Sequence, residues 1–317
     1  MLPTVSLGLG MVAAIIFAST GPAFAAGAQP RAWVSGPGAD VATCGAISAP
    51  CRTLQYAHDN IVAPGGSIYV KGPANYGSII IRHAISIIND GSGTATILAP
   101  SGDAVDVQAA STDAVLIKGM TLDGAGSGKV GVNVTLAGSV VIEDCTIQSF
   151  VTPSGGDGVI VAPVQTGDAA PLTFLVANSR LVGNGGSGFT FVMVLPASGP
   201  AKFPIGLIRG TTISGSFYGV FGSGPGSLVV ADSVIEGAGR GVGLFADLDR
   251  AFVLGKRVHV DGFALGALAQ GGGRLTLSES AFTDDATDLA NASGALGSYG
   301  DNAYSSATGP ITQAAKQ

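Results

Sequence analysis

Short apolar segments recur along the chain from Val115 onward, and each copy has the same form. An apolar residue is followed by any residue, then Gly, Asp or Asn, then two further residues and a second apolar residue. The copies run over 117–122, 142–147, 176–181, 208–213, 230–235, 253–258 and 277–282, with Gly119, Asp144, Asn178, Gly210, Asp232 and Gly255 at the third position and Glu279 as the exception. Gly, Asn and Asp enter the left-handed backbone region most easily. The column therefore predicts a sharp corner between two strands in every repeat.

A glycine opens another short apolar segment after most of these units, as in Gly131-Val-Asn-Val134 and Gly158-Val-Ile-Val161. Each coil of the chain thus holds three strands, with alternate side chains pointing inward. A doubly wound α/β sheet would need amphipathic crossover helices, but the connections are short and glycine-rich. The pattern predicts an all-β fold, a right-handed parallel β-helix over residues 67–290.

The two ends of the repeat need protection, because an open stack exposes strand edges and core. Leu54, Ala57 and Ile61 share one helical face, and Gly65-Gly66 closes that segment. We expect an N-terminal cap with a helix over residues 26–66. The repeat fades after about residue 286, and we expect a C-terminal cap and flexible tail over residues 291–317.

The first 25 residues have the features of a secretory signal peptide. Leu7 to Phe17 is apolar but too short to span a bilayer, and Ala23-Phe24-Ala25 has small-x-small spacing. We expect cleavage after Ala25, no later transmembrane segment, and a secreted or periplasmic protein. In that oxidising setting, Cys44 and Cys51 are expected to form a disulfide.

The cap and first coil resemble those of a known family. The run Ala49-Pro-Cys-Arg-Thr-Leu-Gln-Tyr-Ala57, then Pro64-Gly-Gly-Ser-Ile-Tyr-Val70 and Ile85-Ser-Ile-Ile88, is similar to the amino-terminal part of pectin-lyase-like right-handed β-helix proteins. The likeness is greatest to small secreted bacterial repeat members. It implies the fold, but a fold does not define an activity.

Composition supports a packed protein and excludes one class of partner. Charged residues are only 11% of the chain and mean hydropathy is +0.47, which is far from the profile of a disordered chain. The formal net charge is −6, and the 15 Lys and Arg residues are scattered. No basic stripe is available to neutralise phosphates, so nucleic acid is not an expected partner.

The resemblance places catalytic residues of such enzymes on the outward face of the first strand in each coil. In this sequence the outward positions from Asn133 to Gln270 are expected to carry Phe221 and Phe245 but no ionisable side chain. Glycoside hydrolysis needs two carboxyl groups, and lyase chemistry needs a base with cationic stabilisation. The neutral strip therefore favours binding over catalysis.

Three other groups of residues are candidates for chemistry. Glu236 is expected one ladder step from His259, with Arg257 on the same face, as an acid/base cluster or a solvated ion ladder. Asp247 and Asp249 are candidates for calcium, although two carboxylates make an incomplete set; otherwise no metal or cofactor is expected. Cys145 shares a column with Met120, Ser179, Thr211, Ser233 and Ser280, which favours packing over reactivity.

Two hypotheses of function follow from these observations. The first is an exported, non-catalytic protein that binds a glycan or another cell-surface partner along its outward face, with Phe221 and Phe245 in contact. The alternative is a polysaccharide lyase or glycoside hydrolase that uses Glu236, His259 and Arg257. The sequence specifies no oligomeric state.

Overall fold

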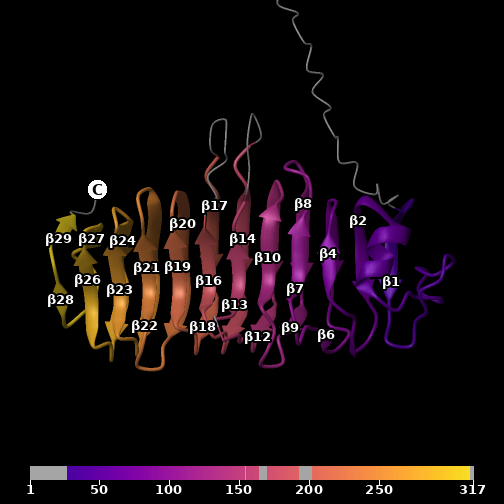
Figure 1. The fold of residues 1–317 in the computed structure, drawn as a ribbon, viewed down its shortest axis with the longest axis horizontal. Coiled ribbons are helices and arrows are strands. Elements are labelled where there is room, and N and C mark those ends of the chain that lie inside the picture. Colours follow the sequence, from indigo (N-terminus) through magenta and orange to yellow (C-terminus); the bar gives the residue numbers. More distant parts are fainter. Residues whose placement is uncertain (1–26, 154, 164–169, 193–201, 315–317) are drawn as a thin grey trace, which may run out of the picture.

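The computed structural model describes residues 27–153, 155–163, 170–192 and 202–314. The chain winds into stacked coils whose strands pair in parallel with those of the neighbouring coils (Figure 1). The strands align along three faces of the stack, which we call face 1, face 2 and face 3. The prediction of a right-handed parallel β-helix is confirmed.

Face 1 is a separate sheet, and its strands lie in one ladder from the cap to the far end. Its described strands are β4 (Ile79–Ile81), β7 (Asp103–Gln108), β10 (Val130–Leu136), β13 (Asp157–Val161), β16 (Ser187–Val192), β19 (Tyr218–Ser223), β21 (Val242–Asp247), β23 (Leu265–Gln270), β26 (Thr287–Ala292) and β28 (Ala307–Thr308).

Face 2 carries the second strand of each coil, and face 3 carries the third. Face 2 holds β1 (Gln29–Val34), β2 (Val62–Val70), β5 (Ile85–Ile88), β8 (Ala114–Lys118), β11 (Ser139–Glu143), β14 (Thr173–Ala177), β17 (Ile205–Arg209), β20 (Gly226–Glu236), β22 (Ala251–Asp261), β24 (Arg274–Ser278), β27 (Ala295–Tyr299) and β29 (Ile311–Ala314). Face 3 holds β3 (Ala74–Asn75), β6 (Ala95–Leu98), β9 (Met120–Asp123), β12 (Thr146–Gln148), β15 (Arg180–Val182), β18 (Thr212–Ser214) and β25 (Ala281–Thr283). The long strands β20 and β22 turn the corner and belong to both faces.

The corner between faces 2 and 3 is left-handed in the coils where the sequence predicts it. Positive φ values of 49–71° occur at Gly119, Asp144, Asn178, Gly210 and Asp232, and Glu279 adopts a φ of 51°. Gly255 was expected at the same corner, and that expectation is wrong. Val230 pairs with Gly255 and Ser233 with Val258, so Arg257 stands opposite Asp232 and has the positive φ of 51°.

The core fills the space between the three faces with aliphatic side chains and a few phenylalanines. The column that contains Cys145 is buried, which confirms the packing interpretation. Burial raises the pKa of the Cys145 thiol to about 12, so it is protonated at neutral pH. The hydroxyl of Ser179 in the next coil accepts the backbone N–H of Cys145 at 3.1 Å. Small polar side chains in this column thus satisfy backbone donors inside the stack.

The N-terminal cap contains the expected helix and disulfide, but the strand ladder begins earlier than expected. A helical segment, α1 (Leu54–Tyr56) continued by η1 (Ala57–Ile61), covers the first coil, and the Cys44–Cys51 disulfide is present. However, β1 already pairs in parallel with β2, so the ladder begins before residue 67.

The C-terminal boundary also differs from the prediction. The face 2 ladder continues through β27 to β29, so parallel pairing extends to Ala314. A repeat of small residues such as Ala, Gly and Ser lacks the apolar contrast that marks earlier coils, which is why the sequence pattern ends too soon. Coil length varies along the stack while the pairing does not. The partners Phe189 and Val220 are separated by more residues than the partners Ala267 and Leu289.

Candidate functional site

The outward side of face 1 forms a continuous ladder of side chains. The pairing joins Asn133 to Ile160, and then to Thr190, Phe221, Phe245 and Leu268 in successive coils. The expectation that this strip lacks ionisable groups from Asn133 to Gln270 is wrong at its edge, where Asp247 pairs with Ser223. The strip also continues one coil before its expected start, because Asp106 pairs with Asn133.

Face 1 carries an aromatic and aliphatic cluster outside the core, which we call the outer cluster. Its members are Tyr218, Phe221, Val242, Phe245, Leu265, Leu268 and Ala290. The rings of Phe221 and Phe245 stack at a centroid distance of 4.9 Å, and those of Tyr218 and Phe221 stack at 5.0 Å. The outer cluster does not belong to the main core of the solenoid. It therefore packs on the solvent side of the sheet.

Members of the outer cluster differ in how much surface they present. Phe245 is only 5% exposed, because Phe221 and Leu268 flank it in the ladder. Tyr218 and Phe221 are partly exposed, and Phe217 beside them is 37% exposed and meets Tyr218 edge-on. The accessible part of the cluster thus lies at Tyr218 and Phe221, and Phe245 supports them from behind.

The opposite end of face 1 is polar, which the sequence pattern did not predict. Asn133 donates to Asp103 at 2.8 Å, and Gln108 donates to Asp106 at 2.6 Å. One oxygen of each aspartate, Oδ1, is buried and has no hydrogen-bond partner among the described residues. Burial raises the pKa of Asp106, and the charge of Lys129 acts in the opposite direction.

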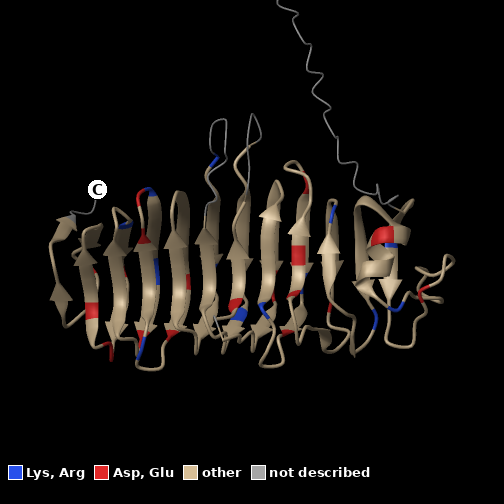
Figure 2. Ribbon diagram, in the orientation of Figure 1, with Lys and Arg blue, Asp and Glu red and all other residues tan. Residues whose placement is uncertain are grey.

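These aspartates line a depression of about 460 Å³ together with Lys129 and residues of β4 and α1. The repeat motif begins only at Val115, so the coils before it have no corner residue by which to align them. The apolar, polar, apolar order of Val105-Asp106-Val107 is the signal in the sequence that could have placed Asp106 on the outward side of face 1. Charged residues are otherwise sparse along the strands and gather near their ends (Figure 2).

The predicted cluster of Glu236, Arg257 and His259 does not form as expected. Glu236 pairs with Asp261, whereas His259 pairs with Val234 and Ala281. Arg257 donates to both carboxylate oxygens of Asp232, at 2.5 and 3.0 Å. The error follows from the shifted corner, because placing Gly255 opposite Asp232 moves every later residue of that coil by two positions.

Arg257 lies in an exposed ion network on the corner between faces 2 and 3, because Glu279 of the next coil is also 3.6 Å from its guanidinium. The Arg257 guanidinium holds the pKa of Asp232 below its usual range. Arg257 therefore forms ion pairs with the corner residues of the coils before and after it, Asp232 and Glu279.

The two carboxylates considered for calcium, Asp247 and Asp249, each interact with a different neighbour. Asp247 accepts the backbone N–H of Leu248 at 2.9 Å, and exposed Asp249 lies 3.6 Å from Arg250. In the described part of the chain, no group of three or more His, Cys, Asp or Glu side chains could hold a metal ion.

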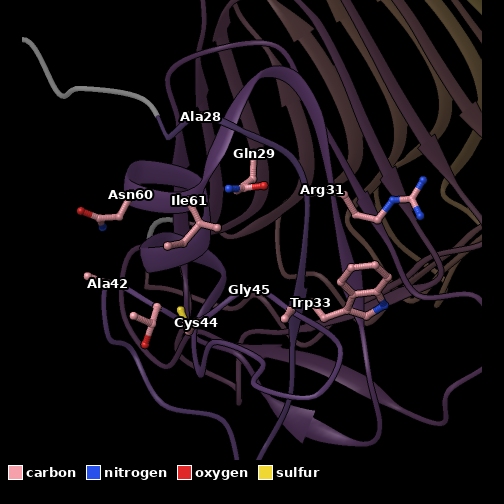
Figure 3. A pocket seen from close by; sticks show the side chains of 11 residues that line it. Ala28, Gln29, Arg31, Trp33, Ala42, Cys44, Gly45, Asn60 and Ile61 are labelled. Carbon is pink, nitrogen blue, oxygen red and sulfur yellow. The ribbon is translucent and has the colours of Figure 1, made fainter.

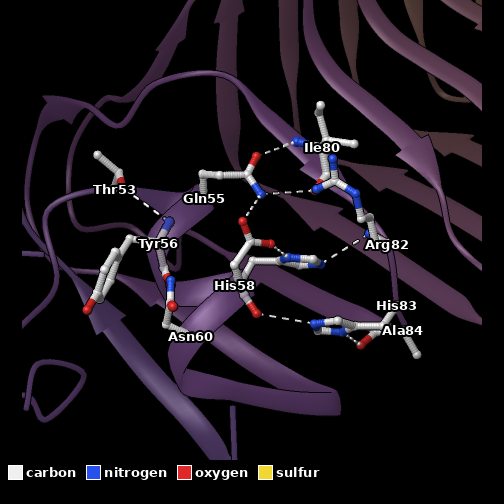
Figure 4. A network of polar contacts seen from close by, with 10 residues as sticks. Thr53, Gln55, Tyr56, His58, Asn60, Ile80, Arg82, His83 and Ala84 are labelled. Carbon is white, nitrogen blue, oxygen red and sulfur yellow. Dashed lines mark hydrogen bonds and ion pairs between the residues drawn. The ribbon is translucent and has the colours of Figure 1, made fainter. Parts of the chain in front are cut away.

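Two histidines connect the cap to the first coil (Figure 4). His58 lies between Asp59, whose carboxylate is 2.7 Å from Nδ1, and the backbone N–H of Arg82, which donates to Nε2. His83 stacks on His58 with a centroid distance of 3.9 Å and contacts the His58 carbonyl. Burial lowers the pKa of His58 and favours its neutral form. Both histidines therefore have packing and hydrogen-bonding roles in the cap.

Comparison with known proteins adds one structural likeness. No family model and no curated protein matches the chain. Among solved structures, the crystal structure of pectate lyase Pel9A is similar with a TM-score of 0.46 and 16% identity over 90% of this chain and 78% of that one. Across the described residues, no helix is long and apolar enough to span a membrane. The strand pairing of this chain itself defines a parallel β-helix.

Proposed function

We propose that this protein binds an extended cell-surface polysaccharide along face 1. The observation that carries the proposal is the outer cluster, an apolar and aromatic surface that the core does not need. Aromatic side chains on a solvent-facing sheet contact the apolar C–H faces and edges of sugar rings. Tyr218 and Phe221 are the proposed contact residues, and Phe245 fixes their orientation.

The polar end of face 1 supplies the second half of the proposed site. Asp103, Asp106 and Asn133 carry planar hydrogen-bonding groups that suit sugar hydroxyls. Coils stack at about 4.8 Å, so the six steps from β7 to β23 span about 29 Å. A ligand that reaches both ends must be an extended polymer.

The experiment compares variants of the outer cluster with a matched aromatic control. Affinity gel electrophoresis against a panel of soluble polysaccharides should identify a retarding polymer. Tyr218→Ala and Phe221→Ala should each weaken that retardation about tenfold, because each removes a ring contact worth about 1 kcal/mol and the packing of its neighbour. Phe252→Ala, which removes a 41% exposed ring from face 2, should leave it unchanged. Equal effects of all three variants, or no retardation by any polymer, would contradict the proposal.

A second candidate function, cleavage of the bound polymer, is favoured by the environment of Asp106. Its raised pKa extends the pH range over which it can donate a proton, and Asp103 and Lys129 line the same depression. Reducing-end or unsaturated products that disappear in Asp106→Asn, while retardation persists, would establish this function. The absence of products across the panel would exclude it. Glu236→Gln is the control, because Glu236 lies at the end of β20, away from face 1.

We propose that binding takes place outside the cytoplasm. The Cys44–Cys51 disulfide supports export, since such bonds persist in oxidising compartments. The expected signal peptide lies outside the described residues, so the direct test is N-terminal sequencing of the exported protein. A mature chain that begins at Ala26 is the expected result, and retention of the first 25 residues would contradict it.

A further inference from the structure

Trp33 stands on β1, at the end of the face 2 ladder. It pairs with Tyr69, and the two rings stack at a centroid distance of 5.9 Å with an interplanar angle of 28°. On the other side of β1, the cap brings Gly45, whose carbonyl accepts the backbone N–H of Trp33. No side chain of comparable size follows, so a ring surface of Trp33 lines a pocket.

Arg31 lies two residues before Trp33 on the same side of β1. Its guanidinium carbon is 5.6 Å from the Trp33 ring centroid and 5.5 Å from the Tyr69 ring centroid. The side chain is exposed, and in the described part of the chain it makes no ion pair or hydrogen bond. The aromatic pair therefore holds a guanidinium group in place while its N–H donors are free for an anion.

The pocket between β1, the disulfide loop and η1 has a volume of about 500 Å³ (Figure 3). Its apolar lining includes Trp33 and Ile61, and its polar lining includes Gln29, Thr43 and Asn60. This volume accommodates a single six-membered ring with substituents. The side chains of Arg31 and Trp33 extend away from Asn60 and Ile61, so the unpaired cation and the aromatic surface form one rim of the pocket and neutral hydrogen-bonding groups line the rest (Figure 3).

We propose that this pocket binds a ring that carries a carboxylate, with the carboxylate on Arg31 and the ring face on Trp33. The planar guanidinium binds a carboxylate through two parallel hydrogen bonds, which neutral sugars and alcohols cannot provide. An acidic sugar and an aromatic acid share this chemistry, and the test distinguishes them. The site lies on face 2 and in the cap, so it is separate from the site proposed on face 1.

Trp33 is the only tryptophan of the chain, so intrinsic fluorescence reports on this pocket alone. The full mature protein is titrated with glucuronate and with benzoate, each compared with its neutral counterpart, glucose and benzyl alcohol. At least one acid should change the emission saturably and bind at least about tenfold more tightly than its counterpart. Saturation by glucuronate identifies a saccharide ligand, and saturation by benzoate alone identifies an aromatic acid.

Arg31→Gln should abolish the preference for the acid, because it removes the guanidinium while Trp33 and Tyr69 remain stacked. Lys71→Gln removes a cation from the same end of the stack without altering the pocket lining, and it should bind as the unchanged protein does. The proposal is overturned if neither acid gives a saturable change, if acid and neutral probe bind equally, or if Arg31→Gln retains the preference. None of these outcomes depends on polysaccharide binding at face 1, so the two proposals fail independently.

Discussion

Asn178 gives the sharpest test of the left-handed corner. It has a φ of 49° and an exposed side chain, which lies over Gly210 in the next coil. An L-residue other than Gly, Asn or Asp costs about 1–2 kcal/mol in this region. We expect Asn178→Gly to change the free energy of unfolding by less than about 0.5 kcal/mol, Asn178→Ala to lower it by about 1 kcal/mol and Asn178→Val by about 2 kcal/mol.

Urea denaturation followed by circular dichroism measures these differences. With an m value of about 3 kcal/mol/M, the Ala and Val variants should shift the midpoint by about 0.3 and 0.7 M. Arg180→Val is the matched control, because it places the same side chain at an exposed strand position two residues away, where β-branched residues are favoured. The reasoning fails if Val is no more destabilising at 178 than at 180.

Three further predictions concern other parts of the fold. Gly255→Ala should change stability by less than about 1 kcal/mol, because a Cβ there would meet only flexible leucine ends at 3.1 Å; denaturation that shows a loss like that of Asn178→Val would return Gly255 to the corner. Replacing Cys44 and Cys51 by Ser should destabilise the cap by about 2 kcal/mol for a separation of 7 residues, seen as earlier urea unfolding by Trp33 fluorescence; an unchanged midpoint would contradict this. Burial raises the pKa of Asp285 from 3.8 to about 6, so the folded state binds the proton more tightly and stability falls as pH rises from about 4 to 6. Asp285→Asn should therefore add about 1 kcal/mol at pH 7, allowing for partial exposure, and little at pH 4; an equal effect at both pH values would refute the assignment.

The sequence predicted the coil because its signals are local. Apolar alternation and the corner residues Asp144, Asn178 and Asp232 each report their own backbone conformation, so the fold could be derived without any long-range information. Arg257 could not be predicted in this way, because arginine has no preference for the left-handed backbone region and so its residue type does not mark a corner. Its conformation is stabilised by Asp232 in the preceding coil, and that contact appears only once the register is known.

The candidate sites were predictable to different degrees. Phe221 and Phe245 were placed correctly on the outward face of one ladder, because alternation within a strand fixes the side. Their stacking, and hence the near-complete burial of Phe245, depends on the register between coils. The pocket at Trp33 depends on how the cap folds back over β1, and no periodic pattern describes a segment that occurs once.

Variation in coil length has a consequence for how such a molecule can change. Phe189 and Val220 pair in register although more residues separate them than separate Ala267 and Leu289, so neighbouring coils keep their partners. Each rung of face 1 can therefore acquire a new side chain or a longer border independently of the rungs beside it. The ligand-contacting side chains of such a stack can therefore change one coil at a time without disturbing the fold. The caps at the two ends are more constrained, because each must fit the single coil on which it packs.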